Sequence, residues 1–403
     1  MSQLVLANLC AGLDLVALIA YAVLGGADFG AGVWDLLARG PTAERQRAAV
    51  AHAIGPVWEA NNVWLIFVLV VTWTAFPIVY AGLSEALFIP LTLVLVGIVF
   101  RGSAYAFRWQ YGGQGRFWGL WGRAFSVAST VTPFMLGAAA GAIAGGDIHV
   151  HNGVAVANYR TTWLTPFALS CGAFAVGLCS VLAATYLTVE ALNSGDTTLR
   201  EVFRQRAIVS GAVTALIGAI AALLARSESP VLWSGLIGTA LPLSLGAVLI
   251  GLATAYCLLA GYYRVARLLV AGEAACILLA WAVAQYPYLI IPDVTLQNAA
   301  ASVASLSTLL IFTAIGLVIL LPSLWYLFRV FKSAHPTQPT ASVAEFVKSL
   351  GQADFGEAAG AGGRGVQSGQ TVEGSVVPGA LLVAASVALA TVWDVLRRRR
   401  RAP

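Results

Sequence analysis

The residues best suited to chemistry lie in a long apolar segment, residues 54–76, whose first half carries Pro56, Glu59, Asn61 and Asn62. An ionisable side chain inside a membrane-spanning helix costs several kcal/mol, roughly 2.5–3.5 on insertion scales, unless it faces a partner or a wet cavity. Glu59 and Asn62 are three residues apart and therefore share one helical face. Such a pair is typical of a hydrogen bond between helices or of a protonatable site in the membrane, and we favour the protonatable site.

Aromatic and proline residues surround this pair. Trp58 and Trp64 flank it in the sequence. Pro56 has no N–H, so the carbonyl of His52 loses its helical partner and is free to accept from water or another donor.

The composition places these residues in a polytopic membrane protein. Hydrophobic residues make up 59% of the 403-residue chain and charged residues 10%, whereas a soluble domain carries roughly 25% charge. The net charge of +5 does not indicate nucleic acid, because the arginines lie in short loops between apolar segments. Single cysteines in apolar segments are typical of buried, inert thiols; they are Cys10, Cys171, Cys179, Cys257 and Cys276.

We expect an all-α chain with nine transmembrane helices, because nine apolar segments have about the length that a ~30 Å hydrocarbon core requires. They are residues 5–27, 54–76, 81–107, 122–144, 163–190, 207–225, 235–262, 265–286 and 304–331.

The loop charges predict that the N-terminus lies outside. Alternate loops carry most of the basic residues, whereas the opposite loops hold only Arg160 and Arg226, and the positive-inside rule places the basic loops in the cytoplasm. The basic residues that we assign to the inside are Arg39, Arg45, Arg47, Arg108, Arg116, Arg123, Arg200, Arg204, Arg206, Arg264, Arg267, Arg329 and Lys332.

This orientation brings three charged residues to a similar depth. Asp28 lies in the glycine-rich run 25–32 at the cytoplasmic end of the first helix, and Glu59 and Arg101 lie in the cytoplasmic thirds of the next two. A buried arginine beside a carboxylate can satisfy it and hold it ionised. We therefore predict a shared polar site, and expect the other intramembrane acids to form local pairs; these are Asp14, Glu85 and Glu273.

Ligands for a haem are scarce. A haem held at membrane depth needs axial His or Met ligands, and Met135 is the only methionine after the first residue. His52 lies at the inner edge of a segment, His149 and His151 in an outer loop, where we expect a solvated pair, and His335 in the tail. We therefore expect the chain to bind no haem alone.

Several motifs together resemble subunit II of the cytochrome bd-type quinol oxidases, from the first helix to about Lys332. The longest are G-x-D-F-G-x-G at 26–32, I-G-P-V-W-E-A-N-N-V-W at 54–64, F-P-x-x-Y-A at 76–81 and R-G-x-x-Y-x-F-R at 101–108. Shorter ones are T-P-F at 132–134, F-R-x-R-A at 203–207, A-Q-Y-P-Y at 284–288 and L-P-S-L at 321–324.

The resemblance implies a haem-free subunit of two four-helix bundles and one peripheral helix. Its partner, subunit I, carries haems b and d and the quinol-oxidation loop, and the complex is an electrogenic quinol:oxygen oxidoreductase of the bacterial cytoplasmic membrane. This chain would hold no catalytic residue and no metal; a bound quinone, lipids and small accessory subunits stay open.

The resemblance also implies roles for individual residues. The acid of the second-helix motif, here Glu59, lies on a proton path from the cytoplasm towards the oxygen-reducing haem. From their depth and helical face we add Asp28, Asn62 and Arg101 to this path, with Asn62 able to orient water. The remaining motif residues have structural roles and are Gly30, Gly55, Pro56, Trp58 and Trp64.

Two departures affect the path. The family often reads D-G-F-D in the first motif, where Gly26 replaces an Asp, and W-D-G-N-[EQ] in the second, where Glu59, Ala60 and Asn62 replace Asp, Gly and Glu or Gln. Glutamate keeps the proton chemistry of aspartate, but the lost carboxylate leaves the proton entrance open.

Two other functions fit the same residues. A proton-coupled secondary transporter would use Glu59 and Asp28, although such proteins carry matching broken helices in both halves and Pro56 has no acidic counterpart in the second half. A purely structural assembly subunit would need no proton path.

The transmembrane oxidase-like domain comprises residues 1–332, and a different C-terminal part follows it. Residues 333–377 are rich in Gly, Ala, Ser and Gln and read as a flexible cytoplasmic linker. Residues 378–403 hold a short apolar segment followed by five arginines at 397–401. Crossing would leave these arginines outside, so we expect an interfacial or re-entrant segment on the anionic inner face.

Overall fold

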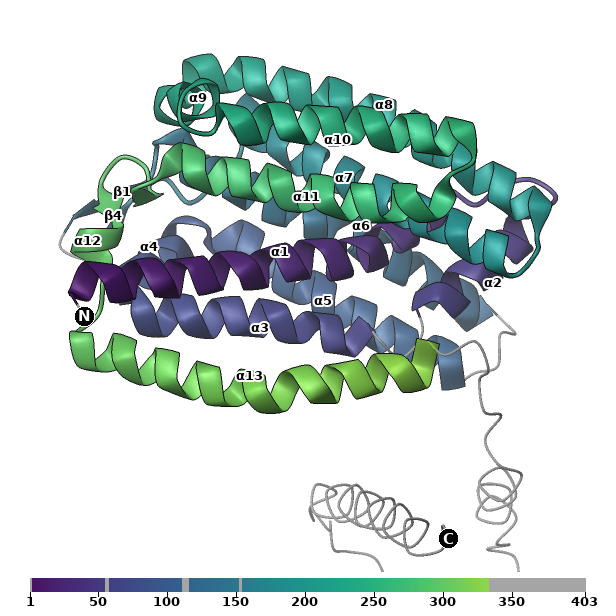
Figure 1. Ribbon diagram of the computed structural model, residues 1–403, viewed down its shortest axis with the longest axis horizontal. Coiled ribbons are helices and arrows are strands. Elements are labelled where there is room, and N and C mark those ends of the chain that lie inside the picture. Colours follow the sequence, from purple (N-terminus) through teal and green to yellow (C-terminus); the bar gives the residue numbers. More distant parts are fainter. Residues whose placement is uncertain (1, 55–57, 111–115, 152–153, 333–403) are drawn as a thin grey trace, which may run out of the picture. The chain divides into compact units, whose positions relative to one another are not determined.

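The computed structural model describes residues 2–54, 58–110, 116–151 and 154–332, and this part of the chain is built from long helices (Figure 1). The helices are α1 (Gln3–Leu36), α2 (Ala43–Ile54), α3 (Trp58–Ala75), α4 (Pro77–Ala86), α5 (Phe88–Gln110), α6 (Arg116–Gly145), α7 (Pro166–Asn193), α8 (Thr197–Glu228), α9 (Pro230–Ile237), α10 (Leu241–Ala260), α11 (Tyr263–Gln285), α12 (Leu296–Ala299) and α13 (Val303–Lys332). Four short strands form two hairpins and are β1 (His149–His151), β2 (Val154–Val156), β3 (Tyr288–Ile290) and β4 (Val294–Thr295).

The prediction of an all-helical polytopic membrane protein is confirmed. Seven of the nine predicted apolar segments lie mainly within a single helix, and the other two are each divided between two helices. Within the described residues, seven helices are long and apolar enough to cross a bilayer, and the number rises to eight if the bent pair α3–α4 forms one span. The seven are α1, α6, α7, α8, α10, α11 and α13.

Two predicted segments are broken. The third, 81–107, is divided at Leu87 into α4 and α5, and the seventh, 235–262, is divided between α9 and α10. Helix α4 is bent by 118° from α3 at Phe76, directly before Pro77. The bend follows because Pro77 has no N–H to continue the hydrogen-bond ladder of α3 but is well suited to the first position of a new helix.

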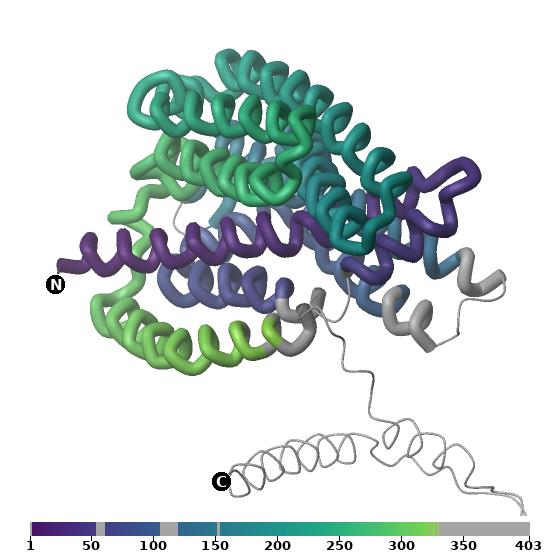
Figure 2. The backbone as a smooth tube through the Cα atoms, turned by 45° about the vertical axis from the view of Figure 1, so that its right-hand side comes forward, coloured from purple at the N-terminus to yellow at the C-terminus, as the bar shows by residue number. Residues whose placement is uncertain are grey.

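Helix α1 is longer than its predicted range, 5–27, because the glycine-rich run does not end it. Its 34 residues span about 51 Å at 1.5 Å per residue. In both views α1 runs through the middle of the described helices (Figures 1 and 2). It contacts α3, α6, α7 and α11, while α13 packs on α1 and α3 only lightly.

The glycines of this run let neighbouring helices approach α1, as the sequence predicts. A Cβ built on Gly30 would lie 1.8 Å from the carbonyl oxygen of Cys179 in α7. One built on Gly32 would lie 2.4 Å from Oγ of Ser129 in α6. Close contacts with α6 and α7 therefore stabilise this part of α1, and they are possible because Gly30 and Gly32 have no side chains.

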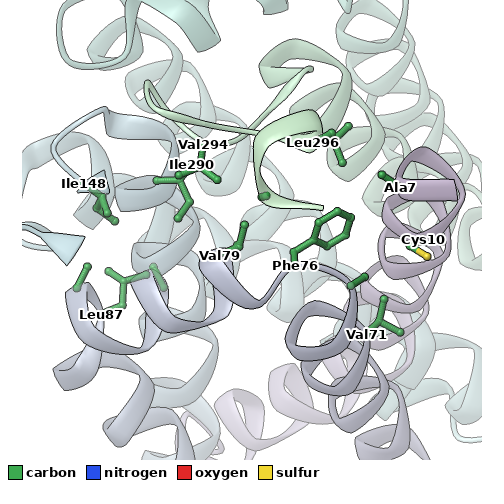
Figure 3. Close-up of a cluster of buried hydrophobic side chains, with 14 of the residues drawn as sticks. Ala7, Cys10, Val71, Phe76, Val79, Leu87, Ile148, Ile290, Val294 and Leu296 are labelled. Atoms are coloured by element: carbon green, nitrogen blue, oxygen red, sulfur yellow. The ribbon is translucent and has the colours of Figure 1, made fainter. Parts of the chain in front are cut away.

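Apolar side chains close one end of the bundle around the bend between α3 and α4. Phe76 at this bend is 2% exposed and packs with residues of α1, α4 and the β3–β4 hairpin (Figure 3). The chain is also tied together here by hydrogen bonds, since Ala301 N donates to Ala75 O (2.9 Å) and Gln3 Nε2 to Ala301 O (2.9 Å). Both hairpins belong to loops that the charge pattern predicts to lie outside.

The contact at Gly30 gives a first testable prediction. Gly30→Ala should strongly reduce the amount of folded protein, because the clash involves backbone atoms of α7 that cannot rotate away; overpacking of this kind costs about 1–3 kcal/mol or more. Gly12→Ala in the same helix is the matched control, since nothing lies within 4 Å of its added methyl group. Thermal unfolding in detergent measures both, and equal midpoints for the two variants would contradict the packing argument.

Candidate functional site

Three neighbouring helices bring polar residues together in one layer. Asn61 in α3 is 5% exposed, and its Nδ2 donates a hydrogen bond to Oδ2 of the half-buried Asp28 in α1. Arg101 in α5 interacts electrostatically with Asp28. The charged residues of α1 and α5 are therefore close enough to interact, while their common depth in the membrane stays a prediction.

The guanidinium of Arg101 is held between two aromatic rings. Its Cζ lies 4.5 Å from the centroid of the Phe29 ring in α1 and 5.5 Å from that of Phe125 in α6. Arg101 is 3% exposed, so its charge depends on Asp28 and on the faces of these rings for stabilisation. Among the described residues, neither its Nε nor its Nη2 has a hydrogen-bond partner.

The amide that contacts Asp28 is Asn61, whereas the sequence argument selected Asn62. Asn62 is half-buried, and among the described residues the amide that hydrogen-bonds to Asp28 is that of Asn61. Adjacent residues in a helix point about 100° apart, so the face that meets α1 is fixed by how α3 packs. The role of Asn62 in orienting water beside Glu59 stays a prediction.

Part of the predicted site lies outside the described residues. The structure does not describe Gly55 and Pro56. It describes the backbone of Trp58 and Glu59, which begins α3, but not their side chains. Trp64, one turn further along α3, is half-buried. The roles inferred for these residues therefore stay predictions.

Tyr21 belongs to this layer and was missed from the sequence. It lies in α1 seven residues before Asp28 and is 4% exposed. Arg101, Cys179 and Asp28 all interact with it electrostatically. A seven-residue interval keeps two side chains on one helical face, so this spacing was the available signal.

Another carboxylate, Asp35, lies on the same face of α1 as Asp28 but nearer the C-terminal end of the helix. Asp35, seven residues after Asp28, is 5% exposed and accepts a hydrogen bond from Oγ of Ser126 in α6 (2.7 Å). The axial rise between Asp28 and Asp35 is about 10.5 Å. The indole of the neighbouring Trp34 donates to the carbonyl oxygen of Ser180 in α7 (2.8 Å). The sequence analysis also missed Asp35.

The other intramembrane acids are separate from this layer. Asp14 accepts from Oγ1 of Thr72 (2.8 Å), and Glu85 accepts from the backbone N–H of Ala155 (3.2 Å). Glu273 in α11 lies against Gly251 of α10, where an added Cβ would be 2.7 Å from its Oε1. Asp14 and Glu85 have the local partners that the sequence predicts, and for Glu273 a local partner stays a prediction.

The histidines lie away from the polar layer. His52 is exposed in α2, and Nδ1 of His149 is 2.9 Å from Oδ2 of Asp293. His149 is exposed, as the sequence predicts, and also contacts the β3–β4 loop. The side chain of His151 and all of His335 lie outside the described residues. No group of three or more His, Cys, Asp or Glu side chains within the described ranges is placed to hold a metal ion. The five cysteines are all free thiols.

Comparison with known proteins decides the family. Residues 6–331 match the family model described as cytochrome bd terminal oxidase subunit II. The chain belongs to this family. Subunit II proteins of this family are parts of respiratory oxidases, and several apolar helices agree with a multi-pass protein of the bacterial inner membrane.

Individual relatives of this subunit II support the assignment. The chain is 28% identical over 207 residues to the cytochrome bd-I ubiquinol oxidase subunit 2 of Escherichia coli (strain K12), covering 50% of this chain and 54% of that one. This alignment thus spans about half the length of that relative. The putative cytochrome bd menaquinol oxidase subunit II of Bacillus subtilis (strain 168) is 22% identical over 77% of this chain and 91% of its own length.

A solved structure shows the same fold. The bd oxidase from Geobacillus thermodenitrificans has a chain that superimposes with a TM-score of 0.66 at 24% identity, covering 81% of this chain and 98% of that one. The described helices therefore share the overall fold of that chain.

Proposed function

We propose that this chain is the haem-free subunit II of a bd-type quinol:oxygen oxidoreductase and lines a proton path from the cytoplasm towards its partner. The observation that carries the proposal is the polar layer of Asp28, Asn61 and Arg101, from three different helices, within an otherwise apolar bundle. A subunit that served assembly alone would have no need of buried charges, whose placement in an apolar interior is costly.

The chemistry of the complex requires such a path. Oxidation of two quinols releases four electrons and four protons, and reduction of one O₂ to two waters consumes four of each. The haems, held by the partner subunit I, supply the oxygen chemistry. If the consumed protons come from the cytoplasm and the quinol protons leave outside, the reaction is electrogenic.

The side chains of this subunit suit proton transfer through the inner half of the membrane. Asp35, beside Ser126, lies nearest the end of α1, and Asp28 follows two turns further in. Asn61 orients the Asp28 carboxylate by donating to one of its oxygens. Arg101 supplies a fixed positive charge, because a guanidinium does not release its proton at ordinary pH. Asp35 thus offers an entrance in place of the carboxylate lost at Gly26, and Glu59 would continue the path from α3.

The histidine and methionine positions support a haem-free subunit. Met135 in α6 is half-buried, and the described histidines are in α2 and β1, outside the candidate spans. These residues do not form the axial ligand pairs that a haem needs at membrane depth. We place both haems b and d in subunit I, together with the quinol-oxidation loop.

The finer architecture belongs to the same proposal. We propose nine transmembrane helices, formed by two four-helix bundles and a peripheral α13, with the N-terminus outside. Helix α13 suits the peripheral role because most of its apolar residues are not buried by the rest of the chain. The linker at 333–377 and the arginine-ended segment at 378–403 lie outside the described residues, and we propose that both stay on the cytoplasmic side.

Purification with and without the partner tests the assignment. The complex should show b- and d-type haem absorbance and consume oxygen with quinol as the electron donor, whereas this chain expressed alone should show no haem bands. Stoichiometric haem in the isolated chain would contradict the assignment, and so would a complex that is active after this chain is removed.

A further inference from the structure

The ring of Tyr21 has a fixed position beside the Asp28 layer. A Cβ built on Gly25 would lie 3.1 Å from its Cε2, so the ring lies over Gly25, in space that the glycine leaves open. The ring also meets Phe29 edge-on, with centroids 6.2 Å apart and an interplanar angle of 80°. Tyr21 therefore leans along α1 towards Asp28 and Arg101.

The polar end of Tyr21 is not used by these packing contacts. Its hydroxyl is buried and has no hydrogen-bond partner among the described residues, and the same holds for Nε and Nη2 of Arg101. Among neighbouring ionisable groups, Arg101 has the largest electrostatic effect on Tyr21. Buried polar atoms are nearly always hydrogen-bonded, to protein or to ordered water. Several orphaned donors in one place therefore indicate a hydration site.

We propose that Tyr21 and Arg101 hold an ordered water and that the Tyr21 hydroxyl carries the proton onward from Asp28, away from the cytoplasm. A hydroxyl both donates and accepts, so Tyr21 can take a proton on its oxygen from the water side while releasing its own proton on the other side. Neither group changes its charge over a full transfer. Arg101 cannot release a proton but fixes the water, and its charge discourages a proton from resting there. This inference rests on the proton path proposed above.

Tyr21→Phe is the direct test, because it removes the oxygen and keeps the ring that packs on Gly25 and Phe29. In the complex with its partner subunit, we expect quinol-driven oxygen consumption to fall about tenfold, which is less than the roughly 100- to 10,000-fold that a positioned acid or base typically contributes, with haem content unchanged. The ratio of turnover in H₂O to that in D₂O should rise, because proton transfer becomes more rate-limiting.

Tyr186→Phe is the matched control. Tyr186 is a half-buried tyrosine in the neighbouring α7, and Cζ of Arg267 lies 4.7 Å from its ring centroid. It resembles Tyr21 in having an arginine partner, but that partner is Arg267 instead of Arg101, so turnover and isotope ratio should match those of the wild type.

The outcomes separate this inference from the proposed function. If Tyr21→Phe has wild-type turnover and isotope ratio while Glu59→Gln is slow, the relay role of Tyr21 is wrong and the proton path stands. If both variants turn over at the wild-type rate, the path itself is wrong. Loss of the haems in Tyr21→Phe would show that the hydroxyl is needed for assembly, which also overturns the relay.

Discussion

Replacing Glu59 with Gln is expected to lower oxygen consumption by the assembled oxidase on the order of 100-fold, while its haem content stays near normal. Glutamine keeps the size and hydrogen-bonding capacity of glutamate but cannot bind and release a proton. The backbone of Glu59 lies in α3, two residues before the amide that contacts Asp28. An oxygen electrode with excess quinol measures the rate, and the haem spectrum of the same sample measures assembly.

Two further variants define what this result means. Glu59→Asp should keep much of the activity, because a shorter carboxylate still titrates. Glu85→Gln should have no effect, since this exposed acid accepts only from the backbone of Ala155 (3.2 Å). Wild-type turnover in Glu59→Gln would remove Glu59 from the proton path, and loss of haem would make it a structural residue instead.

The second large effect is expected at Arg101. Arg101→Gln should destabilise the subunit by roughly 3–5 kcal/mol, because removing one partner of a buried charge pair leaves the other uncompensated. It would also remove the guanidinium from between the rings of Phe29 and Phe125. The yield of assembled complex and its midpoint of thermal unfolding measure the loss.

The control and the rescue distinguish a charge effect from general damage. Arg123→Gln changes an exposed arginine of α6 and should leave the yield unchanged. Adding Asp28→Asn to Arg101→Gln should restore part of the stability, because no lone charge then remains, although activity should stay low. If the loss of unfolding free energy in the double variant exceeds the sum of the losses in the two single variants, the pairing of Arg101 with Asp28 is wrong.

The level of the charged residues could be predicted from the sequence for a simple physical reason. A helix rises 1.5 Å per residue, so once loop charges set the direction of each segment, the position of Asp28 or Arg101 in its segment gives its depth. The same argument predicts the all-helical fold, because apolar segments of this length have few alternatives in a bilayer.

Which side chains become neighbours depends on tertiary packing, and loop charges and segment lengths do not predict it. Whether Asn61 or Asn62 meets Asp28 depends on how far α3 is rotated about its axis. Helix α1 continues beyond residue 27 because Cys179 and Ser129 pack on Gly30 and Gly32, a contact between segments about 100 or more residues apart. Tyr21 was missed because a lone tyrosine in an apolar helix is usually a core residue. It is marked by its hydroxyl, which has no hydrogen-bond partner in the described part of the chain, and by its interaction with Arg101.

The central claim is that protons for oxygen reduction enter from the cytoplasm through this subunit. Inverted membrane vesicles, whose cytoplasmic face is outside, allow this to be measured with a pH-sensitive dye in the medium after an oxygen pulse to the fully reduced oxidase. We predict that the wild type makes the medium more alkaline within one turnover and that Glu59→Gln slows this uptake by the same factor as its oxygen consumption. Unchanged uptake kinetics in Glu59→Gln, or uptake from the vesicle interior, would contradict the account.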